Sequence, residues 1–391
     1  MPKPALKTNR VIRSPQVLDA FITFLRPRLP LDLQHTRITA DEMTEGLAYA
    51  SVNRVSIEAT SAELDNLPSA NRLREVLAAA LPTRAVLQRA LNTILRQQLP
   101  RCLLKGKRSY AIAIDITLIP YHGQPQRDQA EVVRGAPKAG TTHFHGYATV
   151  SIVHHRQRYV VALRFIEAGE AMAAIVGKLL KRLKALRIRL RRLYLDKGFC
   201  AIPVFQTLDR RHVSYIVPIP VRGKSGGVRK LFVGPQGYWT PYTFTSPKHG
   251  VYTVKAVAVR RYTKGRFKRH GVKWFAYAVA GLPPSTTPRQ VFELYRQRFG
   301  IETSYRQMNQ VRARTSTRNP VIRLLLIGLA FILVNLYVAL RENLTTIQRV
   351  ETPGPYIWLS LCRLARLLSR AIEQLLGTKA VLQHRPSTML S

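Results

Sequence analysis

Apolar residues recur every three or four positions through the first hundred residues, a spacing typical of amphipathic helices. The clearest helices are predicted over residues 69–81, opened by Ser69, and 83–99, opened by Thr83 after Pro82. A shorter one is predicted over 17–25. Two helices joined at a Pro-Thr corner suit a DNA-binding helix-turn-helix or a plain helical hairpin equally well. The pattern predicts an N-terminal helical domain and leaves that choice open.

From residue 109 the pattern changes to short apolar runs separated by turn residues, which indicates strands. The predicted order is three meandering strands, then helix, strand, helix and strand. The ranges are 110–120, 146–153, 159–165, 170–186, 193–195, 202–210 and 213–219. This order predicts an α/β fold: a ribonuclease-H-like mixed sheet with flanking helices.

The segment 222–270 interrupts this regular order, since it is rich in Gly, Tyr, Thr and basic residues. Strand-like runs at 230–233 and 252–259 make it a predicted β-rich insertion. A strand at 274–280 and one long helix over 288–314 then complete the core. We therefore expect a helical domain that is a candidate for DNA binding (1–105), an α/β core in two parts (106–221 and 271–345) around the insertion (222–270), and a helical C-terminal region (346–391).

Residues 321–340 are almost wholly apolar apart from Arg323 and Asn335. A membrane-spanning helix needs about 20 such residues, so the length is borderline. The segment stands alone in a very basic chain and has Arg on both sides without an orientation bias. We predict a buried core helix and no membrane association.

The net charge of the chain indicates the class of its binding partner. The 391 residues include 62 Lys and Arg against 21 Asp and Glu, a net charge of +41. Such an excess favours a polyanionic partner, because each phosphate contact releases condensed counterions. A generic basic protein remains the alternative. The three cysteines, Cys102, Cys200 and Cys362, have no paired spacing, which favours a reducing, cytoplasmic environment.

Carboxylates are scarce, so their positions are informative. Asp115 lies in the middle of an otherwise apolar strand, where a buried charge needs an ionic partner or a metal. Asp196 ends another predicted strand, and ligands of α/β sheets collect at the carboxyl ends of strands. Taken singly, a salt-bridged aspartate and a helix-cap or turn aspartate explain them as well.

Glu302 lies on the predicted long helix. Tyr295, Arg298, Glu302 and Asn309 are spaced so that they share one helix face, which Arg306 joins. A solvated charged face is the alternative, although this face carries one acid among several bases. Three carboxylates on separate elements would suit two Mg²⁺ ions that catalyse an in-line displacement at phosphorus, because hard cations require oxygen ligands.

At this point the chain resembles the insertion-sequence DDE transposases of bacteria and archaea. Their third motif, Y-x2-R-x3-E-x6-K, is matched by Tyr295, Arg298 and Glu302, with Asn309 where that family has Lys. The first motif is similar at Asp115-Ile-Thr117, with Tyr121 and Gly123, and the second at residues 195–199 around Asp196. A β-rich insertion between the second Asp and the Glu is also typical of the group. The resemblance covers about residues 109–340.

The resemblance implies that Asp115, Asp196 and Glu302 are the catalytic residues and hold two Mg²⁺ or Mn²⁺ ions. Tyr295 and Arg298 would contact the phosphates of transposon ends, with Arg306 and Asn309 beside them on the DNA-binding face. Arg306, Arg312 or Arg314 could replace the missing lysine. The implied partners are double-stranded DNA, as terminal inverted repeats and target, and further copies of the chain in a homodimer or larger assembly. The implied location is the nucleoid of a prokaryotic cytoplasm.

Other candidate residues carry weaker signals. His143 and His145 alternate as on a strand, and we favour a structural or DNA-contacting role for them over a metal site. Residues 178–192 form a basic stretch, predicted as a helix with a phosphate-facing side. Trp239 in the insertion could stabilise a flipped base, but a core or turn position is favoured.

Three alternatives stay open from the sequence. Another ribonuclease-H-like nuclease, such as a resolvase, would share Asp115 and Asp196 but would not explain the insertion or the Tyr-Arg-Glu helix. A non-catalytic DNA-binding protein derived from a transposase is compatible with Asn309, which stands where the family has Lys. A membrane protein rests on residues 321–340 alone.

Overall fold

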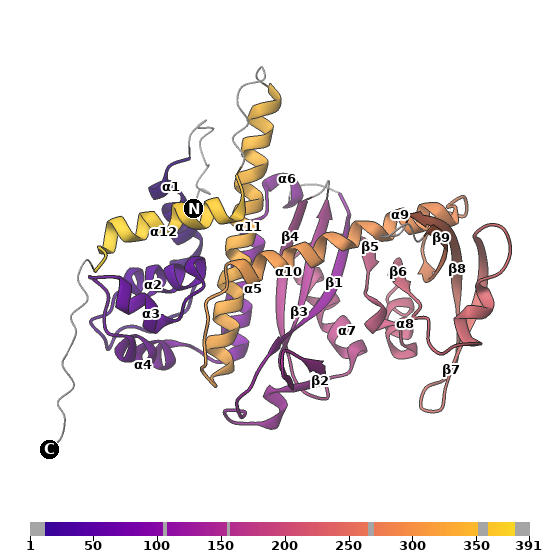
Figure 1. Ribbon diagram of the computed structural model, residues 1–391, viewed down its shortest axis with the longest axis horizontal. Helices are drawn as coiled ribbons and strands as arrows, with labels where there is room; N and C mark the ends of the chain where they lie inside the picture. Colours follow the sequence, from indigo (N-terminus) through magenta and orange to yellow (C-terminus); the bar gives the residue numbers. More distant parts are fainter. Residues whose placement is uncertain (1–11, 105–107, 155–156, 265–269, 351–358, 380–391) are drawn as a thin grey trace. The chain divides into compact units, whose positions relative to one another are not determined.

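The computed structural model describes residues 12–104, 108–154, 157–264, 270–350 and 359–379. The chain divides into two compact units, one of Met1–Gln98 with Arg306–Ser391 and the other of Leu99–Tyr305. The first unit is helical and the second is built on a sheet (Figure 1). The helical unit thus combines the N-terminal region with the C-terminal region that the sequence pattern treated separately.

The helical unit is built from helices at both ends of the chain. The predicted helices at 69–81 and 83–99 are confirmed as α4 and α5. Ser69 caps α4 through its hydroxyl, which accepts from the backbone NH of Arg72, whereas Thr83 precedes α5 without a side-chain cap. The helices described in this unit are α1 (Ser14–Leu25), α2 (Ala40–Asn53), α3 (Ile57–Glu63), α4 (Ala70–Ala80), α5 (Arg84–Gln97), α11 (Pro320–Val350) and α12 (Leu361–Leu376).

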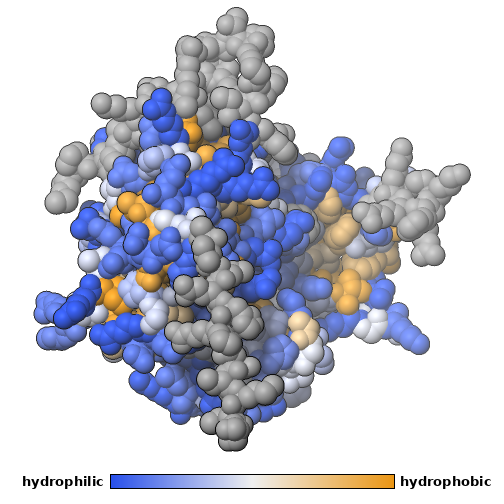
Figure 2. Space-filling model, turned by 60° about the vertical axis from the view of Figure 1, so that its left-hand side comes forward, coloured by the Kyte–Doolittle hydropathy of each residue, from blue (hydrophilic) through white to orange (hydrophobic). Residues whose placement is uncertain are grey.

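The apolar helix α11 packs on α5, α2 and α12 of the helical unit. Pro320–Arg341 is long and apolar enough to cross a membrane, but 89% of its most apolar stretch is buried inside the protein. It packs on α5, where Gly328 lets Leu91 approach, and Gln98 donates a hydrogen bond to the carbonyl of Ile332. The predicted buried core helix is therefore confirmed. On the face drawn in Figure 2, hydrophilic residues predominate and hydrophobic ones form small separate patches.

The helices α4 and α5 pack on different partners. Helix α4 packs on α3, whereas α5 packs on α11, with Leu87, Leu91, Ile94 and Leu95 fully buried. Most of one face of α5 is therefore buried in the core of the unit.

The second unit is one continuous sheet in the order β2-β3-β1-β5-β6-β9-β8-β7, with β4 paired to β3. β1 is antiparallel to β3 and parallel to β5, and β5 is parallel to β6. The predicted strand at 110–120 is confirmed residue for residue. The strands are β1 (Tyr110–Pro120), β2 (Val133–Lys138), β3 (Thr141–His154), β4 (Gln157–Ile166), β5 (Leu190–Tyr194), β6 (Tyr215–Pro218), β7 (Tyr238–Ser246), β8 (Gly250–Lys264) and β9 (His270–Ala280).

The β-rich segment joins the central sheet instead of folding apart from it. β9 pairs antiparallel with β6, and β8 and β7 follow outward in order. The predicted strand at 230–233 is wrong, because residues there form a short 3-10 helix, Gly227–Leu231. β2 and β7 were not predicted; Gly135 and two prolines, Pro137 and Pro241, obscure their alternation.

Helices cover both faces of the sheet. On one face lie α7 (Met172–Ala185) and α8 (Ile202–Asp209), with Phe205 of α8 against Tyr215 and Phe244. On the other face α9 (Pro288–Arg296) packs Val291 and Tyr295 into a cluster with Ala111, Ala113 and Val257.

The predicted single helix over 288–314 is wrong. It is broken into α9, a 3-10 turn (Gln297–Phe299) and α10 (Gly300–Gln310), and the chain has no regular secondary structure from Val311 to Asn319. Gly300 weakens helical continuity at the break, and Thr315 and Thr317 accept backbone hydrogen bonds two residues ahead, which compete with helix formation.

Candidate active site

The strand register places Asp115 and Asp196 beside each other. β1 and β5 run parallel, and their last paired residues are Ala113 and Tyr194. Asp115 and Asp196 each follow two positions later, so both side chains point to the face that holds Ala113 and Tyr194. That face is the one covered by α9. Two carboxylates remote in sequence thus meet where β5 ends beside the middle of β1.

Arg298, in the 3-10 turn between α9 and α10, joins these carboxylates to Glu302. Its Nη1 lies 3.2 Å from Oδ2 of Asp115, and its Nη2 lies 3.3 Å from Oδ1 of Asp196. The same Nη2 is 3.9 Å from Oε1 of Glu302, one helical turn onward. The guanidinium is 5% exposed, whereas the exposed fraction of the carboxylates rises from Asp115 (14%) through Asp196 (37%) to Glu302 (55%). The structure therefore gathers all three predicted acids around one buried arginine.

Burial dominates the ionisation of Asp115. Desolvation raises its pKa from 3.8 to about 6, and the charges of Asp196 and Glu302 add to this rise. The Arg298 guanidinium and the NH of Ile116, which donates to Oδ1 at 2.8 Å, oppose it without cancelling it. A bound cation would favour the charged form of this carboxylate, which burial disfavours.

Tyr295 is not exposed as a DNA-contacting residue would be. Its ring is 4% exposed and packs edge-on against Tyr194 and at 5.1 Å from Tyr277. Its hydroxyl donates to the carbonyl of Leu195 at 3.1 Å, one residue before Asp196. The contact ties α9 to the end of β5, so that Tyr295 fixes the backbone next to the second aspartate.

A further pair at the site was not predicted. The hydroxyls of Tyr305 on α10 and Thr149 on β3 are 2.7 Å apart, and Thr149 lies opposite Asp115 in the β1–β3 register. Tyr305 is half-buried, and its pKa is raised well above 10, first by desolvation and then by the charge of Asp115. Its position three residues after Glu302 was the available signal, because residues three apart share a helix face.

The remaining predicted residues lie as follows. Arg306 and Asn309 are exposed on α10, beyond Glu302. His145 is buried between the rings of Tyr121 and Phe165, and His143 lies at the start of β3. Trp239 is half-buried, donates to the carbonyl of Thr286 and lies under the Lys255 ammonium, 4.6 Å from its ring centre. His145 is therefore packed in the core of the sheet unit, and Trp239 packs beside α9.

The three acids suit a hard divalent cation by chemistry, since all offer carboxylate oxygens. Among the described residues no group of three or more His, Cys, Asp or Glu side chains is already gathered as metal ligands. Arg298 accounts for this arrangement, because its guanidinium lies among the carboxylates and supplies the positive charge there. The donor set fits a metal, provided that Arg298 moves aside.

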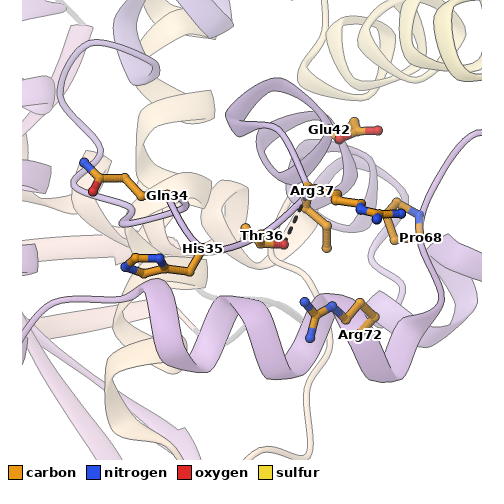
Figure 3. A pocket seen from close by; sticks show the side chains of 8 residues that line it. Gln34, His35, Thr36, Arg37, Glu42, Pro68 and Arg72 are labelled. Carbon is orange, nitrogen blue, oxygen red and sulfur yellow. Dashed lines mark hydrogen bonds between the residues drawn. The ribbon is translucent and has the colours of Figure 1, made fainter.

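A hollow also lies in the helical unit, between the segment before α2 and the start of α4 (Figure 3). It presents His35, Arg37 and Arg72, while the carboxylate of Glu42 is engaged by the NH and hydroxyl of Thr39. This hollow offers positive charge without a nucleophile or a paired acid, so it is a binding surface at most. Its lining residues are Gln34, His35, Thr36, Arg37, Ile38, Glu42, Pro68 and Arg72.

Comparisons with known proteins bear on this site. Residues 106–336 match the family model described as a transposase DDE domain, and this range contains Asp115, Asp196 and Glu302. The fold is similar to that of a cryo-EM structure of the piggyBac transposase synaptic complex with hairpin DNA. The TM-score is 0.56 at 11% identity, over 96% of this chain and 84% of that one. No curated protein sequence matches the chain. Because the family model spans more than half of its length, the chain belongs to the family of transposases with a DDE domain.

Proposed function

We propose that the protein is the DNA transposase of an insertion sequence, which cleaves transposon ends and transfers the strands to target DNA. The observation that carries this proposal is the meeting of Asp115, Asp196 and Glu302 around Arg298. The strand order supports a ribonuclease-H-like core, in which an antiparallel meander continues into parallel strands.

In this function Asp115, Asp196 and Glu302 would hold two Mg²⁺ or Mn²⁺ ions. Such ions, when bound, activate the attacking oxygen and stabilise the leaving one in a displacement at phosphorus. The chain's own contribution is positional. β1 and β5 fix the two aspartates relative to each other, and Tyr295 holds the backbone of Leu195 beside Asp196.

Arg298 has two tasks in the proposal. Without metal it neutralises the buried charge of Asp115 and Asp196, which would otherwise be costly to hold so close together. With metal held by the carboxylates, the guanidinium would turn toward a DNA phosphate, to which arginine binds with two parallel hydrogen bonds. Arg306 and Asn309, exposed on α10, would extend the phosphate contacts.

The partners follow from charge and family. A net charge of +41 favours double-stranded DNA, as transposon terminal inverted repeats and as target. Joining two ends requires two active sites, so we infer a homodimer or larger assembly on DNA. The proposed place of action is the nucleoid in the cytoplasm of a prokaryote.

The test uses the duplex that flanks the gene, incubated with Mg²⁺ and assayed for strand cleavage and strand transfer. Asp115→Ala, Asp196→Ala and Glu302→Ala are each expected to abolish both reactions and to leave DNA binding largely intact. Glu293→Ala is the matched control, because this exposed acid on α9 pairs with Arg261 and Arg296 instead of the site. Full strand transfer by Asp196→Ala would disprove the assignment of the three carboxylates. Cleavage without transfer by the wild-type protein would favour a nuclease.

A further inference from the structure

The face of the sheet opposite the carboxylates carries a second concentration of positive charge. Between residues 171 and 215 the sequence has eleven Lys and Arg but only two acids, Asp196 and Asp209. Asp196 belongs to the site described above. Most of the basic residues are exposed, on α7, on the turns that follow α7 and α8, and at the start of β5. We leave out Lys178 and Lys197, which follows Asp196, and call the other exposed basic residues the amino-edge surface: Lys181, Lys184, Arg187, Arg189, Arg191, Arg210 and Arg211.

These residues form one connected surface. α7 and α8 pack side by side, and a guanidinium nitrogen of Arg211 lies next to Gly177 of α7, 3.5 Å from where a Cβ would be. The turn after α7 leads into β5, and the turn after α8 leads into β6, its parallel neighbour. Both turns lie at the amino ends of these strands, whereas Asp196 follows the carboxyl end of β5. The surface and the carboxylates are thus at opposite edges of the sheet.

Two nearby acids are engaged with other residues. Glu170, at the start of α7, accepts from Arg164 and from Lys178, which is why Lys178 is left out of the surface. Asp209 accepts the hydroxyl of Tyr252 on β8. The basic residues of the amino-edge surface therefore outnumber the acids of the same stretch, and the surface is positive as a whole.

Helix ends explain only a small part of this charge. Cations are favoured in the last turn of a helix by the partial negative charge there. That effect applies to Lys184 on α7 and to Arg210 after α8. It does not reach Lys181 one turn earlier, or Arg189 and Arg191, which lie beyond the turn. A further reason for the charge is needed.

The surface suits a phosphate backbone better than a protein partner. Protein interfaces have an apolar core in which aromatic residues and Met are enriched. Among the described large hydrophobic residues that are exposed, only Met172 lies on α7, and it is at the opposite end of that helix. Lys and Arg side chains without an apolar centre are instead typical of contacts to nucleic-acid phosphates.

We propose that the amino-edge surface binds the backbone of a DNA duplex segment other than the one held at the carboxylates. The sheet with its helices separates the two regions, so a straight duplex at the carboxyl edge cannot also lie along α7 and the amino edge. The binding needs no metal and no particular sequence, because phosphate contacts carry no sequence information.

Lysine reactivity tests the location on the unaltered protein. The full chain is acetylated with and without a short duplex of arbitrary sequence, in EDTA, and each lysine is quantified by mass spectrometry. Lys181 and Lys184 are expected to react several-fold more slowly when the duplex is present. Lys248, between β7 and β8, and Lys273, on β9, are exposed and serve as internal references. Equal protection of all four lysines, or none at Lys181 and Lys184, would overturn the proposal.

Charge reversal tests the energetics. Lys181→Glu, Lys184→Glu and Arg187→Glu are combined in one variant, and Lys230→Glu, Lys248→Glu and Lys273→Glu in a control with the same change of net charge. The first variant is expected to bind the duplex about tenfold or more weakly. The slope of log affinity against log salt should fall by about one for each phosphate that is no longer bound. Affinities reduced equally in the two variants would show that only overall charge matters and would refute the surface.

Two further arms keep the outcome clear. If poly-glutamate protects Lys181 and Lys184 as well as DNA does, the surface binds polyanions in general, which contradicts the proposal. Because the assays contain no metal and no cleavable end, they succeed or fail independently of the transposase activity proposed above. If the enzyme is active but the duplex does not protect Lys181 and Lys184 from acetylation, this inference is disproved and the proposed transposase function is unaffected.

Discussion

The hydroxyl of Tyr305 lies 2.7 Å from that of Thr149, which is the direct cross-strand partner of Asp115. Tyr305 stands on the same helix as Glu302, so this hydrogen bond ties the helix that carries the third acid to the strands that carry the first. The separation of the carboxylates is thereby fixed by two residues that are not acids.

Tyr305→Phe is expected to weaken Mn²⁺ binding several-fold, because α10 loses its polar tie to β3 while the ring still fills its place. In this variant the hydroxyl of Thr149 has lost its partner, which lowers the free energy of unfolding by about 1–3 kcal/mol. Thr149→Val should act similarly, and a double-mutant cycle should give a coupling of about 1 kcal/mol. Tyr121→Phe is the control, since its hydroxyl donates to Gln124 instead. Lower stability with unchanged Mn²⁺ binding would mean that the pair is structural only.

Arg298→Gln is expected to increase the affinity for Mn²⁺ by about tenfold or more in the absence of DNA. The guanidinium competes with any cation for Asp115 and Asp196, at 3.2 and 3.3 Å. Isothermal titration or electron paramagnetic resonance of Mn²⁺ measures the effect directly. Arg296→Gln, an exposed position on α9 paired with Glu293, should leave the affinity unchanged. Weaker Mn²⁺ binding by Arg298→Gln would show that Arg298 supports the metal site instead of occupying it.

Asp115→Asn is expected to stabilise the metal-free protein at neutral pH. The pKa of Asp115 is raised from 3.8 to about 6, so between these values the folded state binds more protons than the unfolded state. The free energy of unfolding of the wild type therefore falls as pH rises through this window, by roughly 2–3 kcal/mol from this group. The variant has no such decrease, so the two proteins should be alike near pH 4 and differ above pH 6.

Urea denaturation at pH 4, 5, 6 and 7 measures this difference. Asp19→Asn, which makes the same change at an exposed position on α1, is the matched control. A constant difference between Asp115→Asn and the wild type at every pH would contradict the explanation by burial.

Gly328→Ala is expected to destabilise the helical unit by about 1–3 kcal/mol through overpacking. A Cβ there would lie 2.6 Å from both methyl carbons of Leu91, which is fully buried on α5. This cost exceeds the gain of up to about 1 kcal/mol that alanine brings to a helix interior.

Gly177→Ala in α7 is the matched control, because its nearest neighbour, a nitrogen of Arg211, would be 3.5 Å away in ordinary contact. It should stabilise the protein or leave it unchanged, and thermal denaturation compares the two variants. Equal stabilisation by both substitutions would argue against close packing of α5 on α11.

Local patterns in the sequence were enough to predict most helices and strands of the core. β1 is found from Tyr110 to Pro120 because an apolar run ending in proline leaves few other structures. Asp115 stood out for the same reason, as one charge inside that run. The elements that were missed are those without clear alternation or periodicity, such as β2 and β7.

The candidate site needed more than local patterns. Sequence spacing suggested that Tyr295, Arg298 and Glu302 share one helix face, but the helix breaks at Gln297–Phe299, and Tyr295 turns into the core. A break of this kind depends on what the neighbouring strands require, which spacing along one element does not record.

The sequence by itself determined the family, the strand that carries Asp115 and the burial of the apolar helix α11, because each depends on a motif or on the polarity of consecutive residues. Only the tertiary structure decided that β9 joins β6, that Tyr305 meets Thr149 and that Arg298 lies among the three carboxylates. Apart from the contact of Arg298 with Glu302 one helical turn away, these contacts join residues roughly 60 to 180 positions apart, and their formation depends on the packing of the whole sheet and its helices. The three acids and Arg298 could be named from the sequence, but the position of Arg298 among the acids could not.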